Sequence, residues 1–187
     1  MIRKLEVLTD GSETNRSGKR IHVYAFVINS FETISFDGGT EMYRESGAEI
    51  EPRMGYEKRY AEWLAFSKAV DYIAKFLDEN RTPNLKVEFY SDYTPLVRFL
   101  RGTQAIKRAR AQYIANMMQR PQSILKRFGD VSFFHVERNR IREADLLARR
   151  ERKFQEQIAS SNSNVPYVLL YAQEPDGIKV IRKESRL

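Results

Sequence analysis

The apolar residues change their spacing along the chain, and this change restricts the fold class. Three segments with strand-like patterns come first, at residues 5–10, 21–28 and 33–36, and turn-forming residues separate them. From Tyr56 to Asn80 the apolar residues recur at helical spacing instead. Short turns favour antiparallel pairing of consecutive strands. The chain is therefore predicted to begin as an antiparallel meander that leads into one long helix.

Strands and helices alternate in the next part of the chain. The predicted strands are 86–92 and 131–136, and the predicted helices are 95–100, 105–128 with a break at Pro121, and 142–158. The order βββαβααβα is typical of an α/β domain in which helices cover a mixed sheet. Such sheets place functional side chains at strand ends.

A second, smaller part is predicted at the C-terminus. Residues 160–164 (Ser-Ser-Asn-Ser-Asn) indicate a linker, and the segments 167–172 and 178–181 flank a Glu-Pro-Asp-Gly turn, which predicts a β-hairpin. We therefore expect a main domain over residues 1–159 and a hairpin appendage over residues 160–187. An isolated hairpin is marginally stable, so it must be covered. We expect it to dock on its own domain in a monomer, with a homodimer or a partner protein as alternatives.

The residue types exclude several classes of site. The chain contains no cysteine and two histidines, His22 and His135, so disulfides, iron–sulfur clusters and thiolate zinc sites are excluded. A metal site must use carboxylates, which favour Mg²⁺ or Mn²⁺. No Gly-rich phosphate loop, signal peptide or apolar run of ~20 residues is found. We expect a cytoplasmic protein.

Basic residues gather in one part of the chain. The formal charge is +7, and residues 98–153 contain 15 Lys/Arg against 5 Asp/Glu, while the other residues contain 17 against 20. Such clustering favours binding to nucleic acid, although a solvated helical surface has the same composition. Within the expected basic handle, residues 98–127, the candidate phosphate contacts are Arg98, Arg101, Lys107, Arg108 and Arg110.

Four acids occupy positions that the predicted fold brings to one sheet edge. Asp10 and Asp92 end predicted strands, Glu62 lies in the first turns of the long helix, and Asp145 lies in the first turn of the helix after the last strand of the main domain. Each alone is better explained as a turn, capping or surface residue. Together they would repel one another unless cations compensate. Two divalent ions held there would suit phosphodiester hydrolysis.

The segments around these acids resemble the motifs of the ribonuclease H family. Thr9-Asp10-Gly11-Ser12 is similar to the first catalytic motif, and Glu62 lies in a helical segment with a small-residue face that is similar to the second. Residues 90–97 resemble the serine–aspartate strand end, and residues 135–149 resemble the closing motif, in which a strand leads into an alanine–aspartate helix. The match covers roughly residues 1–155.

The resemblance implies a fold and a reaction. It implies a five-stranded sheet of order 3-2-1-4-5 and hydrolysis of the RNA strand of RNA–DNA hybrids with two Mg²⁺ ions, for which Mn²⁺ would substitute. Asp10 would bridge both ions, Asp145 would complete one site, and Glu62 with Asp92 would complete the other. His135 stands where several relatives carry a mobile histidine for proton transfer, and an ordinary strand histidine is the alternative.

The nucleic-acid contacts differ from the family pattern. Ser12 and Arg138, from the first and last motifs, join the basic handle as expected contacts. Arg59-Tyr60 replaces an asparagine before the helix glutamate, and Ile141 replaces another asparagine. The family uses these groups to sense ribose 2′-hydroxyls. These differences concern the choice of substrate rather than metal-dependent cleavage. From the resemblance we expect an endonuclease acting on RNA–DNA hybrids, with two alternatives: a resolvase-like or exonuclease-like nuclease acting on DNA, or a nucleic-acid-binding module without turnover.

Overall fold

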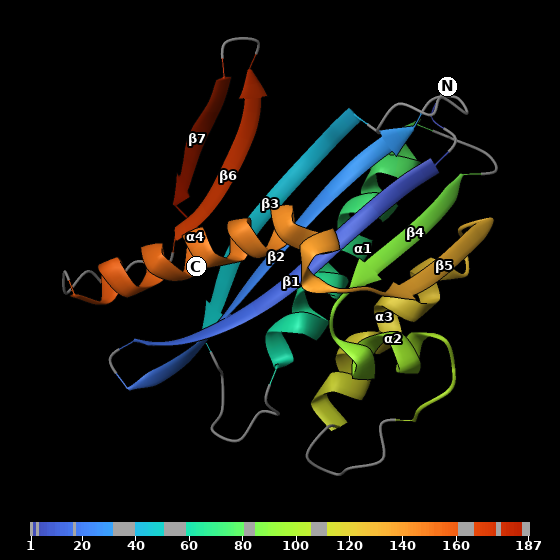
Figure 1. The fold of residues 1–187 in the computed structure, drawn as a ribbon, viewed down its shortest axis with the longest axis horizontal. Coiled ribbons are helices and arrows are strands. Elements are labelled where there is room, and N and C mark those ends of the chain that lie inside the picture. The colour runs from blue at the N-terminus through green and yellow to red at the C-terminus, as the bar shows by residue number, and fades with distance from the viewer. Residues whose placement is uncertain are drawn as a thin grey trace.

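The structure is a computed structural model, which describes residues 2, 4–16, 18–31, 40–50, 59–80, 85–105, 112–160, 167–174 and 177–184. A seven-stranded sheet of order β5-β4-β1-β2-β3-β6-β7 forms its centre (Figure 1). The strands are β1 (Lys4–Arg16), β2 (Lys19–Phe31), β3 (Thr40–Ile50), β4 (Lys86–Ser91), β5 (Asp130–His135), β6 (Tyr167–Glu174) and β7 (Gly177–Glu184). The helices are α1 (Tyr60–Asn80), α2 (Thr94–Leu100), α3 (Gln112–Leu125), the 3₁₀ helix η2 (Arg138–Ile141) and α4 (Arg142–Ser160).

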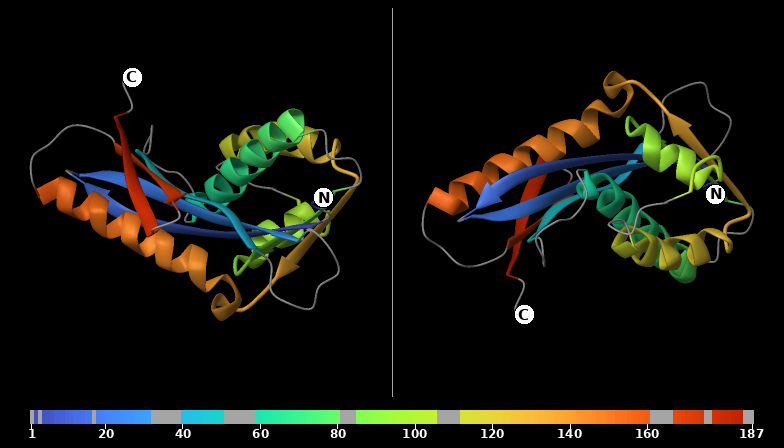
Figure 2. Two further views of the ribbon diagram at one scale, coloured as in Figure 1. Left: turned by 90° about the horizontal axis from the view of Figure 1, so that it is seen from above. Right: turned by 90° about the horizontal axis from the view of Figure 1, so that it is seen from below.

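Helices cover the two faces of the sheet unequally. Helices α1 and α3 lie on one face and α4 crosses the other, where it contacts β1, β2 and β3 (Figure 2). Strand β2 shows the effect on its sequence, since residues 21–28 are all buried. Phe26 faces the larger core under α1, and Val27 faces the smaller core under α4. A strand covered on both faces has a continuous apolar run rather than an alternating one.

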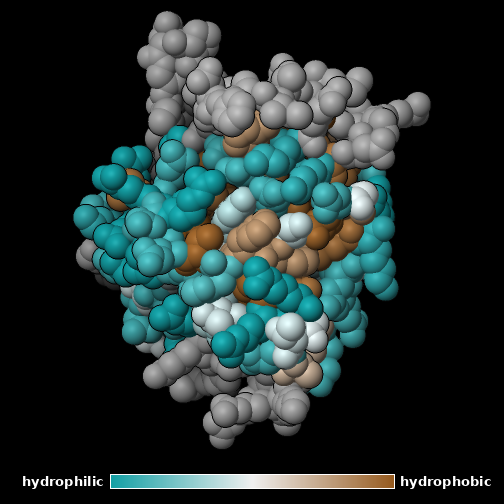
Figure 3. Space-filling model, turned by 45° about the vertical axis from the view of Figure 1, so that its right-hand side comes forward, coloured by the Kyte–Doolittle hydropathy of each residue, from teal (hydrophilic) through white to brown (hydrophobic). Residues whose placement is uncertain are grey.

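The surface is mostly hydrophilic on the face that Figure 3 shows, with a smaller apolar area among the polar residues. Two rings stack on strands near the sheet edge, Tyr90 of β4 and Phe134 of β5, with centroids 5.1 Å apart, and Arg140 lies over Tyr90 at 5.2 Å. None of the described helices combines the length and apolar character needed to cross a bilayer.

The first strand extends further than its sequence indicates. Strand β1 continues through Gly11 to Arg16 and pairs with β2 along its whole length, from Lys4↔Phe31 to Arg16↔Lys19. The expected turn over residues 11–18 is therefore wrong, and Asp10 lies within β1 rather than at its end. Pairing with a long neighbouring strand outweighs the turn preference of these residues. The chain reverses at Gly18, whose φ of +76° suits glycine.

Two other elements differ from expectation. The third strand is Thr40–Ile50, whose glutamates and glycine gave no clear strand pattern, and it is held by antiparallel pairing with β2. The predicted strand at residues 33–36 lies outside the described residues. Helix α3 continues through Pro121, so the expected break is wrong. Pro121 is buried on the same side as Met118, and this packing compensates for the missing N–H donor.

The C-terminal hairpin is present as β6 and β7. Its strands pair in antiparallel register from Tyr167↔Glu184 to Glu174↔Gly177. Strand β6 joins the outer edge of β3 through the pair Glu45↔Leu170, so the hairpin continues the sheet beyond its first five strands. Those five strands have the expected order 3-2-1-4-5.

Candidate active site

Asp10 and Asp92 meet because neighbouring parallel strands differ in length. Strands β1 and β4 pair from Lys4↔Lys86 to Leu8↔Tyr90. Strand β4 then ends at Ser91, while β1 continues. Asp10 and Asp92 each lie two residues beyond the last pair, so they stand at the same level of the sheet. The end of β4 therefore leaves space beside β1 for both carboxylates.

Glu62 reaches this space from the first turn of α1. A Cβ on Gly11 would lie 2.4 Å from the backbone carbon of Ala61 and from the backbone nitrogen of Glu62. Only glycine lets the helix start approach β1 so closely. The Gly11 N–H donates a hydrogen bond to Glu62 Oε2 at 3.0 Å, which orients the carboxylate. The glycine thus positions Glu62 through both its missing side chain and its backbone.

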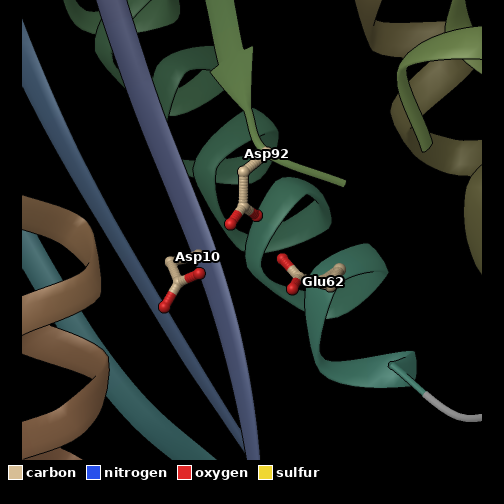
Figure 4. A group of neighbouring side chains, drawn as sticks. All are labelled: Asp10, Glu62 and Asp92. Carbon is tan, nitrogen blue, oxygen red and sulfur yellow. The ribbon is translucent and has the colours of Figure 1, made fainter. Parts of the chain in front are cut away.

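Three carboxylates share one space at this strand end (Figure 4). Asp10, Glu62 and Asp92 each offer an oxygen within 4.8 Å of the others. The side chains of Asp10 and Glu62 are buried, with 3% and 2% of their surface exposed. Among the described residues, Asp10 Oδ1 and Asp92 Oδ1 are buried without a hydrogen-bond partner. Unpartnered buried carboxylate oxygens are costly, and hard divalent cations prefer such ligands. The residues present therefore fit a divalent cation.

The electrostatics of the site reflect the same crowding. Burial, together with the charges of Asp92 and Asp145, raises the pKa of Asp10 to about 7, against the opposing charge of Arg138. The pKa of Glu62 is also raised, first by burial and then by Asp10 and Asp92. A cation bound between these carboxylates would reverse both effects.

Asp145 lies beside the three carboxylates but is held by arginines. It is buried in the first turn of α4. Arg149, one turn further along the helix, places Nε 3.1 Å from Oδ1 and 3.0 Å from Oδ2 of Asp145. Arg138 Nε lies 3.7 Å from Asp145 Oδ1 and 3.1 Å from Asp92 Oδ2. The four acids therefore converge, as the sequence predicts, but Asp145 stands outside the group of three.

A cavity of about 420 Å³ opens beside the acids. Its lining residues are Asp10, Gly11, Ser12, Glu13, Arg59, Ala61, Glu62, Arg138, Asp145, Arg149 and Arg152. The guanidinium groups give this space a mixed charge, with carboxylates on one side and arginines on another. An anionic nucleic acid that enters the cavity would contact arginine side chains close to the carboxylates.

The other predicted site residues differ in their exposure and in their contacts. His135 ends β5, is exposed, and places Nε2 3.2 Å from the backbone oxygen of Asp92. Ser12 Oγ accepts a hydrogen bond from Arg152 Nη1 at 3.4 Å. Arg98 is exposed in the last turn of α2. Arg101 follows that helix and donates from Nε and Nη2 to the Phe133 carbonyl at 2.8 and 2.6 Å.

The central candidates of the basic handle, Lys107, Arg108 and Arg110, lie outside the described residues. Their predicted role therefore stays a prediction.

The comparisons with known proteins bear on the fold. A family model described as reverse transcriptase-like matches residues 78–151. The N-terminal RNase H domain of a Mycobacterium tuberculosis protein, solved as a fusion with maltose-binding protein, is 18% identical with a TM-score of 0.63, and the alignment covers 84% of this chain and 99% of that chain. The chain has the ribonuclease H fold. RNase H1 from the archaeon Halobacterium salinarum NRC-1 has the same fold at 21% identity and a TM-score of 0.58, covering 81% of this chain and 98% of that one.

A third ribonuclease H structure contains a nucleic acid. LC11-RNase H1 in complex with an RNA/DNA hybrid is 19% identical with a TM-score of 0.61, and 80% of this chain and 97% of that chain are covered. No curated protein sequence matches the chain. Within the ribonuclease H fold, the family segment 78–151 includes Asp92 and Asp145, whereas Asp10 and Glu62 lie before it.

Sequence reasoning missed several residues of this site. Arg149 follows Asp145 at i+4 on a helix, a spacing that predicts an ion pair and could have been used. Arg59 gave no such signal: its φ of +68° turns the chain into α1, and its N–H donates to Glu13 Oε1 at 2.9 Å. Its guanidinium lies 3.8 Å from Glu62 Oε1. This contact depends on a turn that only the folded chain forms.

Proposed function

We propose that the chain is a metal-dependent nuclease that hydrolyses the RNA strand of RNA–DNA hybrids. The observation that carries the proposal is the buried group of Asp10, Glu62 and Asp92, in which two carboxylate oxygens have no partner among the described residues. A binding module without turnover has no need for such a group, because burying like charges together is costly. The ribonuclease H fold around the group supports the same conclusion.

Each acid has a distinct role in this proposal. Two Mg²⁺ ions, with Mn²⁺ as a substitute, would supply the activation of water and the stabilisation of the leaving oxygen. Asp10 would hold both ions, as the resemblance implies. Glu62 and Asp92 would complete one site, and Asp145 the other. The hydrogen bond from the Gly11 N–H keeps Glu62 directed into the site.

His135 would transfer a proton at the solvent-exposed side of the site. Its Nε2 lies at the Asp92 carbonyl, and its side chain faces solvent. An imidazole there can pass a proton between water and a departing oxygen. The alternative, an ordinary strand histidine, predicts that His135→Ala leaves the rate unchanged.

Cations beside the acids would position the nucleic acid. Ser12 and Arg138 line the cavity, Arg138 also contacts two of its acids, and Arg98 is exposed in the last turn of α2. Arg101 and the segment with Lys107, Arg108 and Arg110 would continue the basic handle. Phosphate contacts of this kind set register without reading sequence. The structure of LC11-RNase H1 with an RNA/DNA hybrid, which shares the fold, supports this substrate class.

A DNA substrate is the second candidate, favoured by one observation. Ile141, which stands where the resemblance places an asparagine, is completely buried and packs under α4. It therefore offers no polar group to a ribose. A nuclease that does not sense 2′-hydroxyls would accept DNA.

A parallel cleavage assay tests the proposal. RNA–DNA hybrid, double-stranded RNA, duplex DNA and branched DNA are each incubated with the protein and Mg²⁺ or Mn²⁺. We expect cleavage of the RNA strand in the hybrid, and loss of that cleavage in Asp10→Asn and Asp145→Asn, which remove charge but little volume. Faster cleavage of a DNA substrate would favour the second candidate. Variants within about tenfold of the parent rate, a barrier change of ~1.4 kcal/mol, would contradict the assigned acids.

The basic handle has its own test. Replacing Lys107, Arg108 and Arg110 by alanine should weaken binding to all nucleic acids and flatten the dependence of affinity on salt. The control replaces Lys68 and Lys86, which lie outside residues 98–127 and pair with Glu49 and Glu88, by glutamine. We expect the control to retain more of the salt dependence. Unchanged affinity in the first variant, with altered preference between hybrid and DNA, would contradict a phosphate-positioning role.

A further inference from the structure

Arg138 contacts two of the four acids from an element that carries neither of them. It lies in η2, between β5 and α4, and its Nε is 3.1 Å from Asp92 Oδ2 and 3.7 Å from Asp145 Oδ1. We propose that Arg138 is a displaceable counter-ion, which holds Asp145 in the metal-free protein and must leave before Asp145 can bind a second divalent ion. The inference rests on the proposed metal site, and it concerns the order in which that site fills.

The acids differ in how freely a cation can reach them. Asp92 offers Oδ2 to Arg138, but its Oδ1 is buried without a partner among the described residues. One ion can therefore bind Asp10, Glu62 and Asp92 while Arg138 stays in place. Asp145 has no such free oxygen, because Arg149 lies within 3.1 Å of both oxygens and Arg138 approaches Oδ1. A second ion must compete with these guanidinium groups for the same lone pairs.

The two arginines are not equivalent in this competition. Arg149 belongs to the same helix as Asp145, at i+4, and contacts it alone among the four acids. Arg138 stands between Asp145 and Asp92, so its charge occupies the space on the side of Asp145 that faces the other acids. A divalent ion and the Arg138 guanidinium would repel each other strongly if both occupied that space. Arg138 is therefore the group that a second ion displaces.

The cavity offers Arg138 a place after displacement. Its side chain is 53% exposed, and it lines the same cavity as Asp10 and Asp145. A phosphate of the nucleic acid would be a suitable new partner, since guanidinium groups bind phosphate and carboxylate oxygens in the same geometry. In the absence of nucleic acid no such partner compensates for the lost contacts. The second ion should then bind weakly without substrate.

Titration of the whole protein with Mn²⁺, followed by calorimetry and by the electron paramagnetic resonance of free Mn²⁺, tests the inference without an activity measurement. The variants are Arg138→Gln, which removes the charge, and Arg138→Lys, which keeps it. Arg152→Gln is the matched control: Arg152 lines the same cavity, but its Nη1 donates to Ser12 and its Nε lies 3.7 Å from Glu156. It removes an equal charge without freeing Asp145.

We expect one tighter and one weaker binding event in the parent protein. Arg138→Gln should tighten the weaker event about tenfold, as expected when one charge-assisted contact no longer competes. Arg138→Lys and Arg152→Gln should change it by less than about threefold. In metal-free buffer Arg138→Gln should also melt at a lower temperature than Arg152→Gln, because Asp92 and Asp145 lose a shared counter-ion. Added Mn²⁺ should remove that difference.

The outcomes separate this inference from the proposed function. An unchanged or weakened second event in Arg138→Gln overturns the counter-ion role and leaves the nuclease proposal standing. If the parent protein binds no ion but Arg138→Gln does, the counter-ion role is supported. The proposal that the parent is a metal-dependent nuclease is then overturned. If neither protein binds Mn²⁺, both are overturned. Should Arg138→Gln fail to fold, Arg138→Lys decides: an affinity gain despite its retained charge overturns the role, and parent-like binding supports it.

Discussion

At the scale of single residues, the candidate site depends on groups that are placed against ordinary preferences. Gly11 stands inside a strand, where glycine is unfavourable, because the start of α1 leaves no room for a Cβ. Arg59 has a positive φ just before the same helix. Asp10 and Glu62 are carboxylates with almost no exposed surface. Unfavourable conformations and buried charges of this kind are common at functional sites, where the surrounding packing holds them in place.

Gly11→Ala tests the close approach. The added methyl must displace the backbone of α1 near Glu62, so we expect a loss of about 1–3 kcal/mol of stability in urea denaturation together with weaker Mn²⁺ binding. Gly47→Ala is the control. Its Cβ would lie 2.6 Å from the Tyr24 hydroxyl, and its strand, β3, is separated from β1 by β2. It should lower stability but keep the metal affinity. Equal metal affinity in both variants would show that Gly11 does not position Glu62.

Asp10→Asn should change stability in a pH-dependent way. Because the folded-state pKa of Asp10 is raised from 3.8 to about 7, its effect on stability is favourable below about pH 4 and is lost as the pH rises through 7. In metal-free buffer the variant should thus match the parent near pH 4 and exceed it at pH 8, by at most ~4 kcal/mol. Denaturant titrations at the two pH values measure this. Glu143→Gln, at an exposed acid of α4, is the control. A parent that is more stable than Asp10→Asn at pH 8 would contradict the crowding of these carboxylates.

At the scale of elements, helix α4 sets the position of Asp145 by its packing on the sheet. Its contact with β3 includes a buried polar group, in which Gln155 Nε2 donates to Glu151 Oε1 at 2.7 Å and Ser46 Oγ lies 3.4 Å from Glu151 Oε2. Glu151 is completely buried, and burial raises its pKa against the effect of these two hydrogen bonds. The helix is therefore fixed to the sheet by a hydrogen-bonded carboxyl group whose pKa is raised by burial.

Two substitutions at Glu151 should have opposite effects. Glu151→Ala leaves Gln155 and Ser46 without their partner and opens a cavity, so we expect a loss of about 2–4 kcal/mol. Glu151→Gln keeps the volume and removes the ionisable group. The raised pKa makes the parent less stable as the pH rises above about 4.5. The free energy of unfolding of Glu151→Gln, relative to that of the parent, should therefore increase from pH 5 upwards. Urea denaturation measures both, with the exposed Glu156→Ala as control. A pH-independent difference for Glu151→Gln would show that folding does not raise the pKa of Glu151.

At the scale of the whole molecule, the hairpin extends a sheet that is otherwise complete. Strand β6 pairs with the edge of β3 at Glu45↔Leu170, far from β4 and the acids in the strand order. We propose that residues 1–159 form the catalytic domain and that residues 160–187 are an appendage. In this arrangement the hairpin covers the edge of β3, which protects the sheet from pairing with other chains.

Truncation after Ala159 tests the role of the hairpin. We expect the shortened chain to melt at a lower temperature, because β3 becomes an edge strand, and to keep its Mn²⁺ affinity and its cleavage of the hybrid. Differential scanning calorimetry and sedimentation velocity are measured on both proteins. An unchanged melting temperature with a change from dimer to monomer would show that the hairpin joins two copies instead.

The sequence by itself determined the elements whose pattern is local. Three patterns could be predicted: the run of residues 21–28, which is apolar except for His22, the helical spacing up to Asn80 and the strand at residues 86–91. Burial on one or two faces imposes such patterns on a sequence. The motifs around the four acids likewise indicated that Asp10, Glu62, Asp92 and Asp145 lie near one another.

The tertiary structure decided what depends on neighbours distant in sequence. Strand β1 passes through the predicted turn at Gly11 because β2 pairs with its whole length. Strand β3, rich in glutamate, is a strand because it pairs with β2. Arg138 reaches Asp92 across 46 positions of the chain, a contact without any local signal. Strand pairing and charge interactions between distant elements stabilise these features. A short segment of sequence therefore carries no signal of them.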